Sequence, residues 1–126
     1  MPIEAITGGG VPTSHLPFSP AIKANGFLFV SGQASVDDSG RVVSDIFDNE
    51  MRRSLENVRR ILKAASLDFE HVVQVRSYLK NSADFPRYNE IYREFFKEPF
   101  PARTTIVNCL GTVLYEVDVV AAYPQQ

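Results

Sequence analysis

Residues 21–30 have the sequence AIKANGFLFV, in which Asn25-Gly26 separates two apolar runs. Asn-Gly in this position predicts a β-hairpin, because both residues of the favoured two-residue turn need positive φ. The second strand of the hairpin continues into Ser31-Gly32-Gln33. A glycine there lets a ligand approach the backbone and Ser31 offers a hydroxyl, although an ordinary strand end explains the same residues.

Two amphipathic helices are predicted further along the chain. Between Phe47 and Ala65, apolar residues recur at steps of three and four, which defines one face of a helix. In the second helix, Asp84 is placed to cap the N-terminus and Pro86 lies in the first turn. The apolar side of this second helix is formed by Phe85, Tyr88, Tyr92 and Phe95.

Three further apolar segments predict strands, at residues 72–79, 102–107 and 114–122, with a short extra strand expected at 4–6. Together with the hairpin and helices they predict a two-layer α+β domain. Its five- or six-stranded mixed sheet carries both helices on one face. The other face then has no cover, which favours a homo-oligomer because a wide apolar sheet face rarely stays in water.

Length and composition predict one globular domain over residues 1–126. The chain is 44% hydrophobic and 22% charged, which is ordinary for a protein with a single core. No apolar run approaches the roughly 18 residues of a membrane span, and no signal sequence opens the chain. With a single cysteine and no internal disulfide, we expect a cytoplasmic protein without a membrane partner.

The charged and metal-binding residues limit the chemistry further. Thirteen Lys and Arg against fifteen Asp and Glu give no basic field for a phosphate backbone, so nucleic acid is not an expected partner. Cys109 has no C-x-x-C partner, and His15 and His71 lack the spacing of metal ligands. We therefore expect neither a metal nor a cofactor. No His and Asp are placed to make Ser31 a triad nucleophile.

Arg103 and Glu116 are the main candidates for chemistry, because each lies inside an apolar strand where an unpaired charge is costly. The period of two places Thr105 on the same side of its strand as Arg103, and Asp118 on the same side as Glu116. One interpretation is a cross-strand ion pair between Arg103 and Glu116 at a solvated edge. The alternative is a site in which Arg103 binds a substrate carboxylate and Glu116 acts on water.

Six short segments carry a family resemblance that covers residues 3–122. They are LPFSPA (16–21), FVSGQ (29–33), LENV (55–58), YNEIY (88–92), PARTT (101–105) and YEV (115–117). Together they resemble the Rid family, also known as the YjgF or L-PSP endoribonuclease family. The Pro-Ala-Arg segment followed by a Glu on the next strand is the most specific part of the resemblance.

The resemblance implies a chorismate-mutase-like subunit in a homotrimer with ligand clefts between subunits. It implies cofactor-free hydrolytic deamination of reactive 2-imino and enamine acids to 2-keto acids and ammonia, so the expected ligand is a small carboxylate. By position, Arg103 matches the carboxylate-binding arginine, Glu116 the residue that positions or activates water, and Thr105 a residue whose backbone lies near the reacting carbon. The positions that match cleft-lining residues are Phe18, Ser31, Gly32 and Asn89.

Two positions depart from the family pattern. Many members have Tyr where this chain has Phe18, so the hydroxyl is absent while the aromatic wall remains. Many have Cys where this chain has Thr105, which removes a thiol role and keeps a backbone contribution. Two other functions stay open, a non-catalytic carboxylate-binding or chaperone-like trimer and an endoribonuclease, although the sequence offers no basic groove with interleaved aromatic residues.

Overall fold

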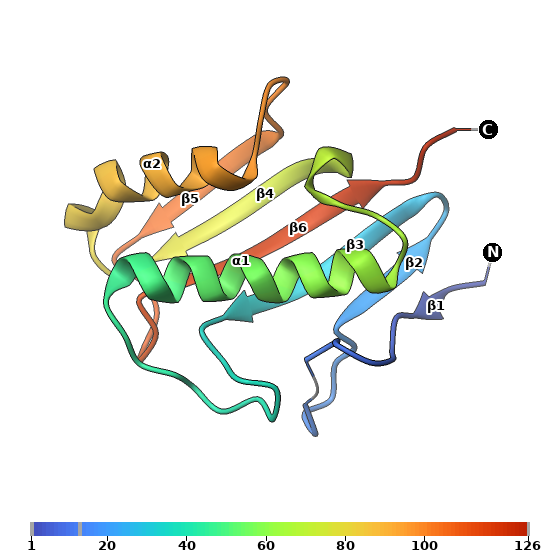
Figure 1. Ribbon diagram of the computed structural model, residues 1–126, viewed down its shortest axis with the longest axis horizontal. Helices are drawn as coiled ribbons and strands as arrows, with labels where there is room; N and C mark the ends of the chain where they lie inside the picture. Colours follow the sequence, from blue (N-terminus) through green and yellow to red (C-terminus); the bar gives the residue numbers. More distant parts are fainter. Residues whose placement is uncertain (1, 13, 126) are drawn as a thin grey trace.

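The computed structural model describes residues 2–12 and 14–125, which form a six-stranded mixed sheet with two helices on one face (Figure 1). The strands are β1 (Glu4–Ala5), β2 (Ala21–Ala24), β3 (Phe27–Ala34), β4 (Val72–Leu79), β5 (Ala102–Val107) and β6 (Tyr115–Ala122). The helices are α1 (Phe47–Ala64) and α2 (Phe85–Phe95), and short 3₁₀ turns at Phe69–His71 and Ser82–Asp84 precede β4 and α2. The α+β prediction is confirmed, including the short first strand.

The predicted hairpin is confirmed. β2 and β3 pair antiparallel, and the turn residues of Asn25-Gly26 have φ values of 54° and 83°. Leu28 and Val30 point toward the helices and are buried, while Phe27 and Phe29 on the opposite side are 40% and 47% exposed. The hairpin therefore contributes to both faces of the sheet.

The strand order β1-β2-β3-β6-β4-β5 separates the last two strands of the chain. β4 lies between them, antiparallel to β6 and parallel to β5, and α2 forms the crossover between the parallel pair. A cross-strand ion pair between Arg103 and Glu116 is therefore wrong, because β5 and β6 are not neighbours. β5 instead forms one edge of the sheet.

The core lies between the sheet and the two helices. All six apolar positions predicted for the first helical face are buried, namely Phe47, Met51, Leu55, Val58, Leu62 and Ala65. α2 buries Tyr88, Ile91 and Tyr92. Asp84 occupies the N-cap of α2, but its side chain makes no capping hydrogen bond within the described chain, so that part of the prediction is wrong.

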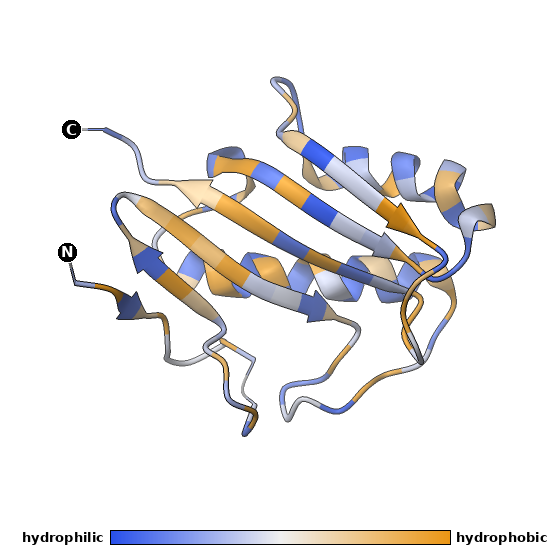
Figure 2. Cartoon of the chain, turned by 180° about the vertical axis from the view of Figure 1, so that it is seen from behind, coloured by the Kyte–Doolittle hydropathy of each residue, from blue (hydrophilic) through white to orange (hydrophobic). Residues whose placement is uncertain are grey.

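The opposite face of the sheet is not covered by α1 or α2, and Figure 2 shows apolar and polar bands alternating along its strands. Apolar side chains on this face include Phe27, Phe29 and Ile106, which are 40%, 47% and 47% exposed. We call this side of the sheet the open face. Its exposed aromatic and aliphatic groups are of the kind that proteins usually cover by association.

Glu50, in the first turn of α1, ties two loops to the helix. Its side chain is buried at 2% exposure. One carboxyl oxygen accepts the backbone N–H of Asp45 at 3.0 Å, and the other accepts that of Leu114, also at 3.0 Å. An acidic residue in a first helical turn ordinarily contributes only a favourable charge near the helix N-terminus. The Glu50 carboxylate in fact holds the backbone of Leu114, which directly precedes β6 and lies two residues before Glu116.

Glu50→Gln is expected to lower the free energy of unfolding by about 2 kcal/mol, because the amide offers one acceptor to two backbone N–H donors. Urea denaturation at fixed protein concentration measures the change. Glu56→Gln on the exposed side of α1 is the control, since it removes only a surface ion pair with Arg59 and should cost less than about 0.5 kcal/mol. Equal stability of the Glu50 variant and the wild type would contradict this role for Glu50.

Candidate functional site

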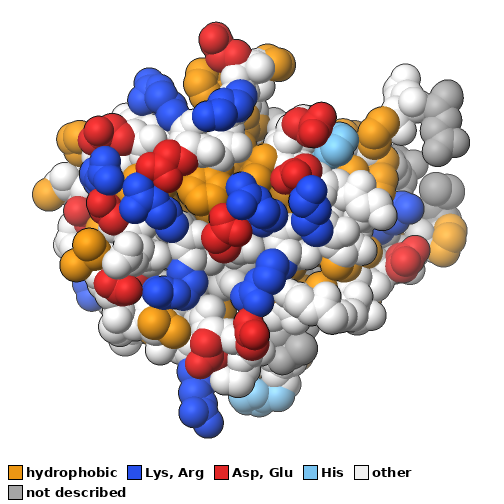
Figure 3. All heavy atoms as spheres, in the orientation of Figure 1, with side chains coloured by type: hydrophobic (Ala, Val, Ile, Leu, Met, Phe, Trp, Pro, Cys, Tyr) orange, Lys and Arg blue, Asp and Glu red, His pale blue; other side chains and the backbone are white. Residues whose placement is uncertain are grey.

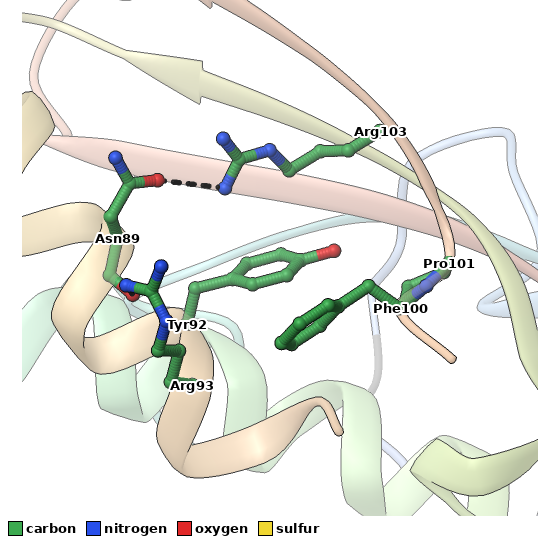
Figure 4. A pocket seen from close by; sticks show the side chains of 6 residues that line it. All are labelled: Asn89, Tyr92, Arg93, Phe100, Pro101 and Arg103. Atoms are coloured by element: carbon green, nitrogen blue, oxygen red, sulfur yellow. Dashed lines mark hydrogen bonds between the residues drawn. The ribbon is translucent and has the colours of Figure 1, made fainter. Parts of the chain in front are cut away.

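Arg103 lies on the edge strand β5 and points to the side of the sheet that carries the helices. Its guanidinium lies over the rings of Tyr88 and Tyr92, 4.7 and 4.8 Å from their centroids. Its Nη1 donates to Oδ1 of Asn89 at 2.9 Å (Figure 4). Among the described residues, no carboxylate forms an ion pair with it. Stacking and one amide therefore hold the guanidinium, and the remaining N–H groups are free for an anion.

A cavity of about 310 Å³ lies beside this guanidinium, between α2 and the start of β5 (Figure 4). Its lining residues are Asn89, Tyr92, Arg93, Phe100, Pro101 and Arg103. The size suits a small organic molecule, and the aromatic rings with a few polar groups give the wall the mixed character of a ligand site.

Thr105 faces the same way as Arg103 but is engaged with the core. Its Oγ1 lies 2.7 Å from the hydroxyl of Tyr88, which is itself completely buried. The side chain of Thr105 thus supports the ring on which Arg103 rests, and only its backbone remains for a ligand. The sequence pattern predicts Tyr88 on the apolar side of α2, but it does not predict that the Arg103 guanidinium stacks on the Tyr88 ring.

Glu116 lies on the open face, next to Gly32 of β3. A Cβ atom built on Gly32 would be 2.5 Å from Oε2 of Glu116, so the absence of a side chain there makes room for the carboxylate. Partial burial, and secondly the charge of Asp118, raise the pKa of the Glu116 carboxyl above its ordinary value. No ion pair or side-chain hydrogen bond from another described residue reaches this carboxylate. Such a group is suited to accept a proton from water.

Asp118, the next open-face residue of β6, is held by its neighbours on β4. Its carboxylate accepts a hydrogen bond from Nε of Arg76 at 2.7 Å and another from the hydroxyl of Tyr78 at 2.9 Å. These partners leave Asp118 as a fixed negative charge beside Glu116. Its contribution to the site is electrostatic, through the pKa of Glu116.

The strand segment that faces Glu116 is irregular. The register between β3 and β6 shifts between Val30 and Gln33, which makes a β-bulge at Ser31-Gly32. Bulges of this kind redirect side chains and are common next to active sites. Here the bulge brings the bare backbone of Gly32 against the Glu116 carboxylate.

Ser31 anchors the preceding loop to this bulge. Its backbone N–H donates to the carbonyl of Pro20 at 2.9 Å, and its hydroxyl donates to the carbonyl of Ser19 at 2.6 Å. The loop carries Phe18, which is 50% exposed and lines a second hollow together with Gly32. The hydroxyl proton of Ser31 is thus used in a structural hydrogen bond, and the loop places Phe18 at the same hollow as Gly32.

The predicted site residues therefore form two groups on opposite faces of one sheet. Arg103, Thr105 and Asn89 lie on the helix side, whereas Phe18, Ser31, Gly32 and Glu116 lie on or beside the open face. The pairing partners on β4 show which face each group occupies. Val75, which pairs with Arg103, is buried under the helices. Tyr78, which pairs with Glu116, lies on the open face. The cavity beside Arg103 contains none of the second group.

Gly32→Ala is expected to displace the Glu116 carboxylate while leaving the fold intact. The atom that a new Cβ would meet is the end of a flexible side chain, so the stability loss should stay below about 1 kcal/mol. If Glu116 acts on water, hydrolysis of the 2-imino acids that the family resemblance implies should fall by about tenfold or more. Gly9→Ala is the matched control, because nothing lies within 4 Å of its Cβ position. Unchanged turnover in the Gly32 variant would contradict a role for this contact.

The residues suited to metal or thiol chemistry have other surroundings. Within residues 2–12 and 14–125, no group of three or more His, Cys, Asp or Glu is placed to hold a metal ion. His71 accepts the backbone N–H of Asp68 on Nδ1 at 3.0 Å and closes a capping box before β4. His15 is exposed, and Cys109 is partly buried. None of the helices in the described part of the chain is long and apolar enough to cross a membrane.

The arginine pairs of α1 belong to a surface of mixed charge. Arg52, Arg53, Arg59 and Arg60 form ion pairs with Glu94, Asp45, Glu56 and Asp38, respectively. Figure 3 shows basic and acidic side chains interspersed over this face. This pairing is typical of the solvated side of a helix and not of an RNA-binding patch.

Comparison with known proteins adds an independent line of evidence. A family model described as Endoribonuclease L-PSP matches residues 10–123. A RutC family protein of Pyrococcus horikoshii is 39% identical over 121 residues, which cover 94% of this chain and 96% of that protein. A human protein named 2-iminobutanoate/2-iminopropanoate deaminase is 41% identical over 101 residues, which cover 79% of this chain and 74% of that protein.

Solved structures agree with the fold. The YjgF gene product of E. coli is similar with a TM-score of 0.84 and 29% identity, covering 94% of this chain and 98% of that one. A Rid family protein, YyfA of Yersinia pestis, has a TM-score of 0.89 and 29% identity, with coverage of 96% and 99%. With the family match over most of its length, this chain belongs to the Rid family, also called the YjgF or L-PSP endoribonuclease family.

Proposed function

We propose that this protein hydrolyses reactive 2-imino and enamine acids to 2-keto acids and ammonia, without a cofactor, in clefts between the subunits of a homotrimer. The observation that carries the proposal is a complementary pair of unpaired charges. Arg103 presents a stacked guanidinium without a carboxylate partner among the described residues, and Glu116 presents a carboxylate with a raised pKa. The name of the human relative gives the reaction class.

Arg103 holds the substrate through its carboxylate. The planar guanidinium gives two parallel charge-assisted hydrogen bonds, while Asn89 and the two tyrosine rings fix its orientation. This places the imine carbon at a defined position in the cleft. The carbon of a protonated imine is already electrophilic, so the substrate needs no further activation. The protein has only to position a water molecule and supply a mild base.

Glu116 handles the proton transfers. It accepts a proton from water as the water oxygen bonds to the imine carbon, which gives a tetrahedral carbinolamine. The same carboxyl group returns the proton to the amine, the carbon–nitrogen bond breaks as the carbinolamine hydroxyl gives its proton to the carboxylate, and ammonia leaves the 2-keto acid and takes up that proton. One water is consumed for each ammonia released. An enamine substrate first gains a proton on carbon and then follows the same route.

The two groups of site residues need more than one subunit. Arg103 and Glu116 lie on opposite faces of the same sheet, so a common substrate takes Arg103 from one subunit and Glu116 from another. The open face, with Phe27, Phe29 and Ile106, is the surface on which subunits meet in this proposal. A closed cyclic trimer then has three equivalent clefts.

The experiment that tests the function measures ammonia and 2-keto acid released from imines that an amino acid oxidase generates in situ. The protein is expected to accelerate both over the spontaneous rate, and light scattering is expected to give three times the mass of one chain. Binding of 2-keto acids with no acceleration for any imine would support the non-catalytic alternative and contradict the proposal. RNA cleavage that is lost in Glu116→Gln would support the endoribonuclease alternative.

A further inference from the structure

The cavity beside Arg103 contains a second arginine. Arg93 lies one turn after Asn89 on α2 and lines the same cavity of about 310 Å³. Its Nη1 donates to the backbone carbonyl of Asn89 at 3.3 Å, while the side chain of Asn89 accepts from Arg103. Figure 4 shows both guanidinium groups next to Asn89. One residue of α2 thus positions two cations at one cavity.

The charge of this cavity is one-sided. Two of its six lining residues are arginines, and none is acidic. The nearby acids of α2 are engaged with other arginines, Glu90 with Arg87 and Glu94 with Arg52. Neither Arg93 nor Arg103 forms an ion pair with another described residue. A site with two free cations favours a ligand that carries two negative charges over one that carries a single charge.

The wall of the cavity also holds an unpartnered donor. Tyr92 is 4% exposed, and its hydroxyl is buried without a hydrogen-bond partner among the described residues. Burial raises the pKa of this hydroxyl above its ordinary value of 10.0, so it remains a donor at neutral pH, as an ordinary tyrosine does. Figure 4 shows the ring of Tyr92 directed toward β5, below Arg103 and beside Phe100. A buried donor without a partner is uncommon in a finished core, and Tyr92 is one of the residues that line this cavity.

We propose that the preferred substrates are 2-imino acids with a second carboxylate on the side chain, the imines of aspartate and glutamate. This inference rests on the hydrolysis proposed above. Arg103 binds the carboxylate next to the imine carbon, and Arg93 binds the distal carboxylate. The stoichiometry is unchanged: one water adds at the imine carbon, one ammonia leaves, and the product is a 2-keto dicarboxylate. Arg93 selects the substrate and takes no part in the proton transfers.

The test compares two kinds of ligand on three proteins. Calorimetry measures binding of 2-oxoglutarate and 2-oxobutanoate, and coupled assays measure hydrolysis of glutamate and alanine imines, for wild type, Arg93→Gln and the matched charge control Arg52→Gln. The wild type and the control are expected to prefer the dicarboxylates by about tenfold in both measurements. In Arg93→Gln the preference should disappear through a loss of about tenfold with the dicarboxylate ligands, whereas Arg52→Gln should hydrolyse alanine imine within about twofold of the wild-type rate. Arg93→Lys should restore part of the preference, because it returns the charge without the planar fork.

The outcomes separate this inference from the function on which it rests. Hydrolysis of all imines with no dicarboxylate preference, or a preference that survives in Arg93→Gln, would overturn the assignment of Arg93 and leave the deaminase proposal intact. Tight, Arg93-dependent binding of 2-oxoglutarate without hydrolysis of any imine would overturn the deaminase proposal and support the dicarboxylate site.

Discussion

Replacing Arg103 with alanine is expected to lower kcat/KM for 2-imino acids by about 100- to 1,000-fold, because the substrate carboxylate loses both charge-assisted hydrogen bonds. The fold should not change. The side chain is exposed and rests on Tyr88 and Tyr92 from outside, so its removal opens no hole in the core. Arg103→Lys keeps the charge but not the planar fork, and should recover only a small part of the loss.

Steady-state kinetics with imines formed in situ measure the effect, and thermal melting with light scattering shows that the variant is folded and assembled. Arg52→Ala is the control, since it removes an exposed arginine that pairs with Glu94 on the outer surface of the helices. It should leave kcat/KM within about twofold of wild type. If Arg103→Ala retains most of the wild-type activity, Arg103 is not the carboxylate-binding group.

Replacing Glu116 with glutamine is expected to lower kcat by about 100-fold or more, with unchanged or higher thermal stability, because the base is lost while the shape is kept. Burial and the neighbouring Asp118 raise the pKa of Glu116, so its ionised form is disfavoured in the folded state. Above the folded-state pKa, the ionised Glu116 lowers the free energy of unfolding. This destabilisation is lost as the pH falls from the folded-state pKa toward the lower pKa of the unfolded chain. Glutamine carries no such charge, so an activity loss with no stability loss separates a catalytic role from a structural one.

The same pKa shift predicts the acid side of the pH–rate profile. Glu116 must be ionised to accept a proton, so kcat/KM should rise with pH through a pKa above its ordinary value of 4.5. Asp118→Asn removes one cause of the raised pKa and should move this limb to lower pH. Values of kcat/KM measured between about pH 4 and 8 for the wild type and for Asp118→Asn give the pKa of the acid limb in each protein. An acid limb that persists in the residual activity of Glu116→Gln would belong to another group.

Local patterns in the sequence predicted most of the elements and the facing of their residues. Asn25-Gly26 predicted the hairpin because its turn is a local property of the backbone, and the spacing from Phe47 to Ala65 predicted the buried face of α1. The period of two correctly placed Arg103 with Thr105 on one side of a strand. These features depend on residues close in sequence.

Features that depend on which strands become neighbours could not be predicted in this way. The period of two does not say that β4 lies between β5 and β6, and so it left open an ion pair that the topology forbids. The contact between Gly32 and Glu116 depends on the same pairing. The buried carboxyl of Glu50 was also missed, because an acidic residue in a first helical turn usually lies in solvent.

The claim that one site is shared between subunits is tested most directly by mixing two inactive variants. Arg103→Ala and Glu116→Gln are unfolded together in equal amounts and refolded. In a closed trimer whose clefts take Arg103 from one subunit and Glu116 from the next, about one cleft in four receives both wild-type residues, so about a quarter of the wild-type activity should return. If the two residues act within a single subunit, every cleft lacks one of them. A mixture as inactive as its parents would therefore contradict the shared site.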